Sequence, residues 1–208
     1  MKPTKESPEY KNAISVQRMR DSDAYTIANL VPSKELMYRA AMGIYDAAKW
    51  RGNIAIVCGS GNNAGDGYAL ACILKDNGID STLIRVSDKF SDDGKYYYDM
   101  AIEKGVAENG SLDFKGFDIL VDCLLGTGFS GAPRGRYADA IRAINSSSAY
   151  VISADINSGL NGDTGESTLA VKSDLTVSIG YYKTGMFLRD APKLIGDLVN
   201  VDIGIVLV

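Results

Sequence analysis

The feature that most constrains the fold is an alternation of short apolar runs with helix-like segments, which begins just after Gly52. Short apolar runs between turn-forming residues are typical of buried strands, and apolar residues spaced three and four apart are typical of helices. The alternation predicts βαβ units, in which helices connect the strands of a mostly parallel sheet. The predicted strands are Asn53–Cys58, Ser81–Val86, Asp118–Leu125, Tyr150–Asp155, Leu175–Ile179 and Leu198–Ile205.

Two further helices are expected ahead of the first strand. Apolar residues recur at helical spacing over Ser33–Lys49, where Ser33 is a suitable N-cap after Pro32. A weaker pattern predicts another helix over Val16–Asn29. The helices predicted between the strands are Asp66–Asp76, Ser91–Lys104 and Tyr137–Ile144. The pattern therefore predicts an α/β protein in which residues 1–208 form one domain with an N-terminal helical extension.

Charge and histidine content narrow the classes of function. The chain has 208 residues and a formal net charge of -4, whereas domains that bind nucleic acid usually carry a concentrated basic excess. Small molecules or proteins are therefore the expected partners. The chain contains no histidine, which excludes histidine-assisted Ser or Cys nucleophiles and metal sites that need imidazole. Any acid–base chemistry has to come from Asp, Glu, Lys, Tyr or Cys.

The N-terminus and the cysteines indicate the cellular compartment. The first twelve residues are polar and charged with no apolar stretch behind them, so neither a signal peptide nor a membrane span is expected. Cys58, Cys72 and Cys123 lie in predicted strands or a helix without CxxC spacing, which favours buried free thiols in a reducing compartment. A cytoplasmic protein without a membrane partner is expected.

Glycine, asparagine and aspartate gather in three segments, each directly after a predicted strand. The segments are Gly59–Asp66, Gly126–Gly135 and Asp155–Gly162. In a parallel sheet such loops all emerge at the carboxyl edge, where open α/β folds bind their ligands. The sequence therefore predicts one ligand site that is built from three separate segments.

The first segment suits an anion but fits no standard nucleotide motif. Glycines at 59, 61 and 65 precede a helix, so backbone N–H groups and the helix N-terminus could hold a pyrophosphate. The spacing is not GxGxxG, Arg85–Ser87 stands where a ribose-binding acid is expected, and a Walker lysine is missing, so dehydrogenase and P-loop chemistry are disfavoured. The alternative is that Asn62–Asp66 is a capped turn and that the glycines of the second segment provide only flexibility.

Two aspartates and a serine carry the remaining chemical signals. Asp122 lies inside an apolar strand, where a carboxylate needs either donors from the chain or a cation held by oxygen ligands. Asp155 ends the next predicted strand and suits general acid–base work, with turn capping as the alternative. Ser158 has no histidine and no GxSxG context, so it is expected to be a ligand or a turn residue, not a nucleophile.

Three motifs, in this order and spacing, resemble the YjeF N-terminal family of NAD(P)H-hydrate epimerases. They are GSGNNAGDGYALA from Gly59, DILVDCLLGTGFSGAPRG from Asp118 and SADINSGLNGDTG from Ser153, and the resemblance covers about Ile14–Val206. It implies a Rossmann-like three-layer α/β/α sandwich, usually a homodimer, that interconverts the R and S forms of NADHX and NADPHX. Ala64, Asn157 and Tyr38–Arg39 depart from the common family pattern without removing an implied ligand.

The resemblance also implies roles for individual residues. The implied substrate-binding residues are Asn62, Asn63, Ala64, Gly65, Asp66, Gly126, Thr127, Gly128, Phe129, Ser130, Gly131, Ala132 and Asp155. A potassium ion is the implied cofactor, with Asn63, Asp122 and Ser158 as ligands. Asp155 and Lys183 are the implied catalytic residues, and Lys183 could face the phosphates or assist proton transfer. Arg85, Lys89 and Arg134 could each favour a 2'-phosphate or could simply be solvated.

Partners and rival functions follow from the same resemblance. The chain ends at Val208, near the point where bifunctional members continue, so a separate dehydratase is expected to consume the S form. Two other functions stay open: a non-catalytic dimerisation scaffold of the same fold, and a nucleotide-binding regulator that senses NAD(P) derivatives without turnover.

Overall fold

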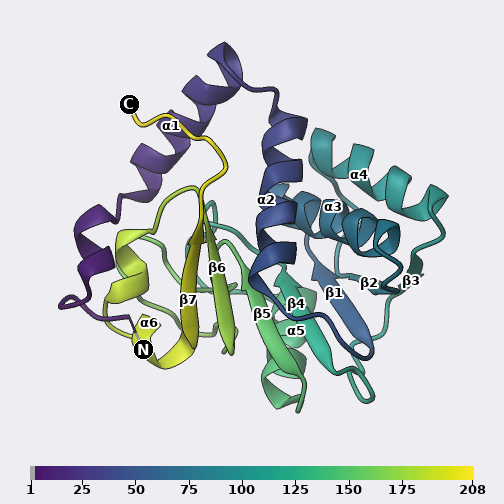
Figure 1. Cartoon of the computed structure of the whole chain (residues 1–208). Coiled ribbons are helices and arrows are strands. Elements are labelled where there is room, and N and C mark those ends of the chain that lie inside the picture. The colour runs from purple at the N-terminus through teal and green to yellow at the C-terminus, as the bar shows by residue number, and fades with distance from the viewer. Residues whose placement is uncertain (1–2) are drawn as a thin grey trace.

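A single parallel sheet runs through the molecule. The computed structural model (Figure 1) describes residues 3–208, so the first two residues of the polar N-terminal segment lie outside it. Seven strands pair in the order β3-β2-β1-β4-β5-β6-β7, and every pair is parallel. The strands are β1 (Ile54–Cys58), β2 (Thr82–Arg85), β3 (Ala107–Asn109), β4 (Ile119–Cys123), β5 (Tyr150–Ala154), β6 (Leu175–Ile179) and β7 (Asp197–Val201).

The helices connect these strands and extend the N-terminus. They are α1 (Val16–Asn29), α2 (Ser33–Ala47), α3 (Asn62–Asp76), α4 (Asp92–Glu103), α5 (Gly135–Ser146) and the short α6 (Ala191–Leu194), with 3-10 turns η1 (Pro8–Asn12) and η2 (Thr184–Phe187). The Ser15 hydroxyl caps α1 by accepting from Arg18 N at 3.1 Å. The prediction that Ser33 is the N-cap of α2 is wrong, because Ser33 is the first helical residue and Pro32 takes the N-cap position.

The sheet separates two apolar layers, as the three-layer prediction requires. Alternate residues of β1 point to opposite faces: Ile54 and Ile56 pack into one core with α2, α3 and α4, and Ala55 and Val57 pack into another with α5. Figure 1 shows α2, α3 and α4 in front of the sheet and α5 behind it. The predicted Rossmann-like α/β/α sandwich with an N-terminal helical extension is therefore confirmed, and its sheet is parallel throughout.

Most predicted boundaries differ from the structure by one or two residues, and three larger differences have local reasons. Strand β3 was not predicted, because its three residues are exposed and lack an apolar run. Strand β7 ends at Val201, and the next residues are held without a sheet ladder, for example by a hydrogen bond from Val206 N to Thr26 Oγ1 at 3.0 Å. Helix α3 begins at Asn62, so the second half of the segment Gly59–Asp66, which was expected to be a loop, is helical.

The cysteine prediction is confirmed within residues 3–208, since Cys58, Cys72 and Cys123 are all buried and free. No helix in that part of the chain combines the length and apolarity that a membrane span needs.

Candidate active site

A cavity of about 540 Å³ lies at the carboxyl edge of the sheet, where the three predicted segments meet. The predicted site residues that line it are Asn62, Asn63, Asp66, Gly126, Thr127, Gly128, Phe129, Asp155 and Lys183. Helix α1 closes one side of the cavity with Met19, Arg20, Asp23 and Ile27, and α2 contributes further lining. The N-terminal helical extension is therefore part of the site.

The other implied substrate-binding residues lie away from the cavity lining. Ala64 and Gly65 are buried in the first turn of α3, and a Cβ at Gly65 would lie 2.6 Å from Met37 Sδ of α2 and 3.2 Å from the Gly94 Cα of α4. Glycine at 65 thus allows three helices to pack closely. Ser130, Gly131 and Ala132 are exposed and line no part of the cavity.

Asp155 and Lys183 form an ion pair inside the cavity. Lys183 is 1% exposed, and its ammonium group also donates to Ile179 O at 2.8 Å. Asp155 has a φ of 63°, a left-handed conformation that aspartate tolerates at a modest energetic cost. Such strain is typical of functional positions, and here it occurs at the residue that the sequence singled out for proton transfer.

The backbone around Lys183 is held by the N-terminal segment. Ile14 N donates to Tyr182 O at 2.9 Å, and Thr184 N donates to Ile14 O at 3.0 Å. A buried ammonium is costly unless it is paired, so these contacts position Lys183 where Asp155 and a backbone carbonyl can satisfy it.

Three more carboxyl groups line the same cavity, those of Asp23, Asp66 and Asp93. Burial raises the pKa of Asp66 well above its ordinary value, and repulsion from Asp155 adds to the shift. Burial also raises the pKa of Asp23, again with repulsion from Asp155. Asp23 lies on α1 and was not predicted; its only signal is a position four residues after buried Met19, on the same helix face. Burial therefore favours the neutral form of Asp66 and Asp23 more than in water.

Asp122 is fully buried beneath the cavity and is satisfied within the chain. Its carboxylate accepts from Ser158 Oγ at 2.5 Å, Ser158 N at 2.9 Å, Ser153 Oγ at 3.0 Å and Leu124 N at 3.3 Å. Burial raises the pKa of Asp122, and the hydrogen bonds from Ser158 oppose that shift most strongly. Of the two alternatives for this residue, a network of donors from the chain is therefore present, and it includes two backbone N–H groups.

Asn63 is the opposite case. It is 7% exposed, and both its carboxamide oxygen and its nitrogen are buried without a hydrogen-bond partner among residues 3–208. It lies beside the second segment, since a Cβ at Gly126 would be 3.3 Å from Asn63 Cβ. A buried amide without partners is costly, and its oxygen is a suitable ligand for a hard cation. The oxygen-only set of Asn63, Asp122 and Ser158 therefore fits an alkali cation.

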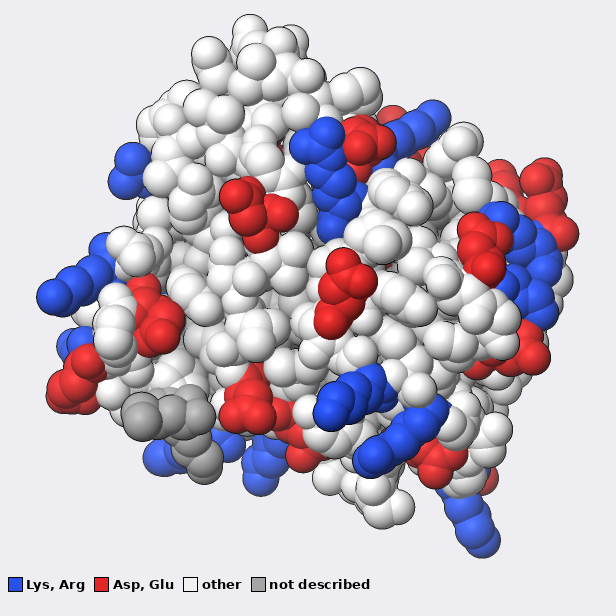
Figure 2. Space-filling model, in the orientation of Figure 1, with Lys and Arg blue, Asp and Glu red and all other residues white. Residues whose placement is uncertain are grey.

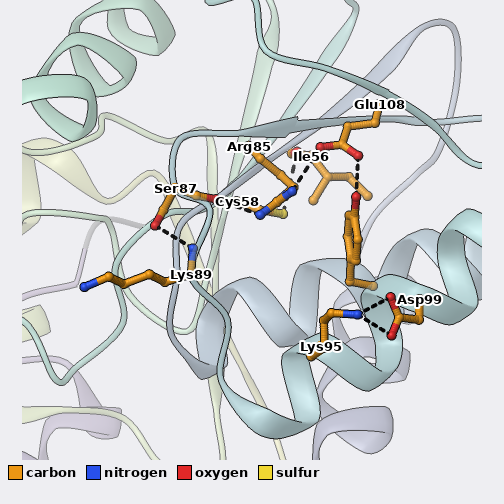
Figure 3. Close-up of polar contacts among 9 residues, drawn as sticks. Ile56, Cys58, Arg85, Ser87, Lys89, Lys95, Asp99 and Glu108 are labelled. Atoms are coloured by element: carbon orange, nitrogen blue, oxygen red, sulfur yellow. Dashed lines mark hydrogen bonds and ion pairs between the residues drawn. The ribbon is translucent and has the colours of Figure 1, made fainter.

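The three basic residues considered for a 2'-phosphate line no part of the cavity. Arg85 pairs with Glu108 at 3.3 Å and donates to Ser87 O at 2.9 Å, as Figure 3 shows. Its guanidinium also lies over the rings of Phe90 and Tyr98, at 4.2 and 4.7 Å from their centroids. The guanidinium group of Arg85 is therefore largely occupied by contacts within the chain. Figure 3 also shows the Lys89 side chain pointing away from this cluster.

The geometry defines a class of protein: a Rossmann-like α/β protein whose small-molecule cavity combines a helix N-terminus, a glycine loop and a buried Asp–Lys pair. This chain belongs to the family described as YjeF-related protein N-terminus, whose model matches residues 33–185.

Curated relatives cover most of the chain. A protein of Limosilactobacillus reuteri (strain DSM 20016) named NAD(P)H-hydrate epimerase is 34% identical, over 89% of this chain and 92% of the relative. A bifunctional NAD(P)H-hydrate repair enzyme of Thermofilum pendens is 38% identical, over 69% of this chain and 30% of the relative. The crystal structure of yeast ynu0, YNL200c, matches 90% of this chain and 86% of its own with a TM-score of 0.76 at 17% identity, which supports the shared fold.

Proposed function

We propose that this protein is an NAD(P)H-hydrate epimerase, an isomerase that interconverts the R and S forms of NADHX and NADPHX. The observation that carries the proposal is the Asp155–Lys183 pair in a cavity lined by all three family segments. The curated relatives that carry the epimerase name support it, because one of them aligns with 89% of this chain.

The chemistry requires a proton to move at the hydroxyl group of the substrate. Water can leave from the hydroxyl-bearing ring carbon with help from the ring-nitrogen lone pair and add back on the opposite face. Alternatively, the hydroxyl gives up its proton and forms a carbonyl as the bond between ring nitrogen and carbon breaks, and the nitrogen takes up a proton; loss of that proton lets the nitrogen attack the other face of the carbonyl, whose oxygen is protonated again. Each route needs one group that accepts a proton and one that donates it.

The cavity offers one group for each role. Asp155 is ion-paired with Lys183 and offers carboxylate oxygens that can accept a proton. Burial, and then repulsion from Asp155, raises the pKa of Asp66 well above its ordinary value, which favours the form that can donate a proton. An ion-paired carboxylate and a buried carboxyl in one cavity suit acid–base catalysis.

The remaining segments suit the nucleotide part of the substrate. The N-terminus of α3, which begins at Asn62, presents backbone N–H groups and a partial positive charge to an anion. The residues from Gly126 to Phe129 line the cavity beside it. Fixing the pyrophosphate in this way would hold the hydrated ring near Asp155, and such positioning accounts for much of the rate in reactions of this kind.

We propose potassium as the cofactor, held by Asn63, Asp122 and Ser158. The unpartnered Asn63 oxygen supports this assignment, because a cation would satisfy it. The Ser158 hydroxyl lies 2.5 Å from Asp122 Oδ1 and 3.1 Å from Leu125 O, so turning its proton to Leu125 frees a carboxylate lone pair. The ion would supply positive charge beside the loop that begins at Gly126 and would order that loop.

A homodimer is also part of the proposal. Tyr25 and Leu30 near the end of α1 and Val208 at the C-terminus are exposed by 44%, 56% and 53%. In Figure 2 the surface over this end of α1, at the top left, carries few charged side chains. An exposed apolar patch suits contact with a second copy of the chain, and light scattering across a dilution series tests it.

The cellular setting completes the proposal. We place this enzyme in the cytoplasm, where the three free thiols of residues 3–208 would stay reduced. A separate nucleotide-dependent dehydratase would consume the S form that this protein supplies.

The direct test is the rate at which purified protein equilibrates R-NADHX with S-NADHX, coupled to an S-specific dehydratase. We expect a rate well above the spontaneous one in potassium and a much lower rate when tetramethylammonium replaces potassium. NADHX binding without acceleration would favour a sensor, and neither binding nor acceleration would favour a scaffold.

A further inference from the structure

The charges that line the cavity are unevenly balanced. Its acidic lining residues are Asp23, Asp66, Asp93 and Asp155, and its basic ones are Arg20 and Lys183. Lys183 is already committed, since it pairs with Asp155 and donates to Ile179 O. A pyrophosphate that enters a cavity lined by more acidic than basic side chains is favoured by a cation that the chain has not already neutralised, in addition to the N-terminus of α3.

Arg20 is such a cation. It is exposed, it lies on α1, and within residues 3–208 it has no hydrogen-bond or ion-pair partner. Its Nη2 atom is 3.7 Å from the position that a Cβ at Gly128 would take, so the guanidinium lies against the loop Gly126–Gly135. Asp23, three residues on, lines the same cavity but forms no ion pair with Arg20.

We propose that Arg20 binds a phosphate group of the dinucleotide substrate and that α1 thereby supplies a specificity-determining residue. A guanidinium can bind phosphate through two parallel hydrogen bonds, which gives both affinity and orientation. The contact with the loop Gly126–Gly135 favours the pyrophosphate over a 2'-phosphate. That loop lies beside the first turn of α3, where an anion is also favoured. The inference rests on the proposed function and adds a residue to its site.

Substitution of Arg20 tests the proposal with a matched control on the same helix. Arg18 is also exposed, donates to Val208 O at 3.2 Å and does not line the cavity, so Arg18→Gln removes the same charge without touching the site. We expect Arg20→Gln to raise KM by about ten-fold, the loss of one charge-assisted hydrogen bond, with kcat almost unchanged. Arg20→Lys should recover part of the affinity, and Arg18→Gln should match the unaltered protein.

Two further experiments distinguish which phosphate group Arg20 binds and whether the result depends on epimerase activity. Equal increases in KM for NADHX and NADPHX identify the pyrophosphate, whereas an increase for NADPHX alone identifies the 2'-phosphate. Calorimetric titration with ADP-ribose, which contains the pyrophosphate, does not need turnover. If the protein fails to epimerise yet Arg20→Gln weakens ADP-ribose binding, the phosphate site stands and the proposed function falls. Equal behaviour of Arg20→Gln and Arg18→Gln in both assays, or no ADP-ribose binding by the unaltered protein, overturns the proposal.

Discussion

Two polar regions at the carboxyl edge of the sheet differ in how far their polar groups are paired within the chain. At the end of β2, Arg85 is paired with Glu108, bonded to Ser87 O and stacked on two rings, and only its Nε atom lacks a partner. In the cavity at the ends of β4, β5 and β6, Arg20 and Asn63 have no partner within residues 3–208. Polar groups that the chain satisfies stabilise the fold, and those it leaves unsatisfied are available to a ligand.

The contrast also shows how this fold departs from ordinary dinucleotide-binding domains. Those domains bind the ribose with an acidic residue near the end of the second strand. Here Arg85 and the Phe90 and Tyr98 rings fill that place. The cavity lies instead toward α1 and the ends of β4 and β5, and the sequence lacks the standard fingerprint.

The largest effect is expected from Asp155→Asn, which breaks the cavity's ion pair. Epimerisation should fall by about 10² or more, because a general base contributes at least that much. The free energy of unfolding should fall by about 3 kcal/mol, because Lys183 stays buried without its counter-charge. Coupled kinetics and denaturant unfolding measure the two effects.

The double variant Asp155→Asn/Lys183→Met separates chemistry from stability. It should regain most of the stability, since no buried charge is left unpaired, and it should stay inactive. An active double variant would assign the proton transfer to another group.

The next effect concerns Asn63, the unsatisfied amide of the cavity. Asn63→Leu removes two buried unpaired polar groups at similar volume, so stability without potassium should stay equal or rise by about 1 kcal/mol. Potassium should raise the melting temperature of the unaltered protein through linkage but not that of the variant, and epimerisation should fall about ten-fold. Equal stabilisation of both proteins by potassium would place the ion elsewhere.

A smaller effect is expected from Arg85→Met, which breaks the satisfied cluster. The free energy of unfolding should fall by about 1–2 kcal/mol through loss of the ion pair and the ring contacts. KM and kcat should be unchanged for both substrates. A selective loss of affinity for NADPHX would contradict the comparison, because it would make Arg85 a phosphate ligand.

The smallest effect is a change in pH dependence at Asp66. Its pKa is raised by burial and by Asp155, so between its unfolded value of about 4 and the raised folded value the folded state retains a proton that the unfolded state has released. Stability should therefore decline as pH rises through this window. Asp66→Asn should make the decline shallower in unfolding measured from acid to neutral pH, and an unchanged slope would mean that Asp66 is ionised.

Local periodicity accounts for the parts of the molecule that could be predicted. The apolar runs of β1, β4, β5 and β6 and the spacing in α2 are properties of neighbouring residues, so they are visible without the fold. The three segments converge as expected, because parallel strands end at one edge. Strand β3 and the helical start of α3 at Asn62 were missed, because pairing and packing with distant elements decide them.

The sequence by itself determined the α/β order, the convergence of three segments on one cavity and the position of Asp155 at the end of a strand. Only the tertiary structure decided which polar groups keep their charge or hydrogen-bonding capacity for a ligand. Asp122 is satisfied by Ser158, which lies far along the chain, and Arg85 pairs with Glu108, whereas Asn63 and Arg20 meet no partner among the residues that the structure describes. The physical reason is that satisfaction of a buried polar group depends on atoms within about 3 Å, and these come from segments that only folding brings together.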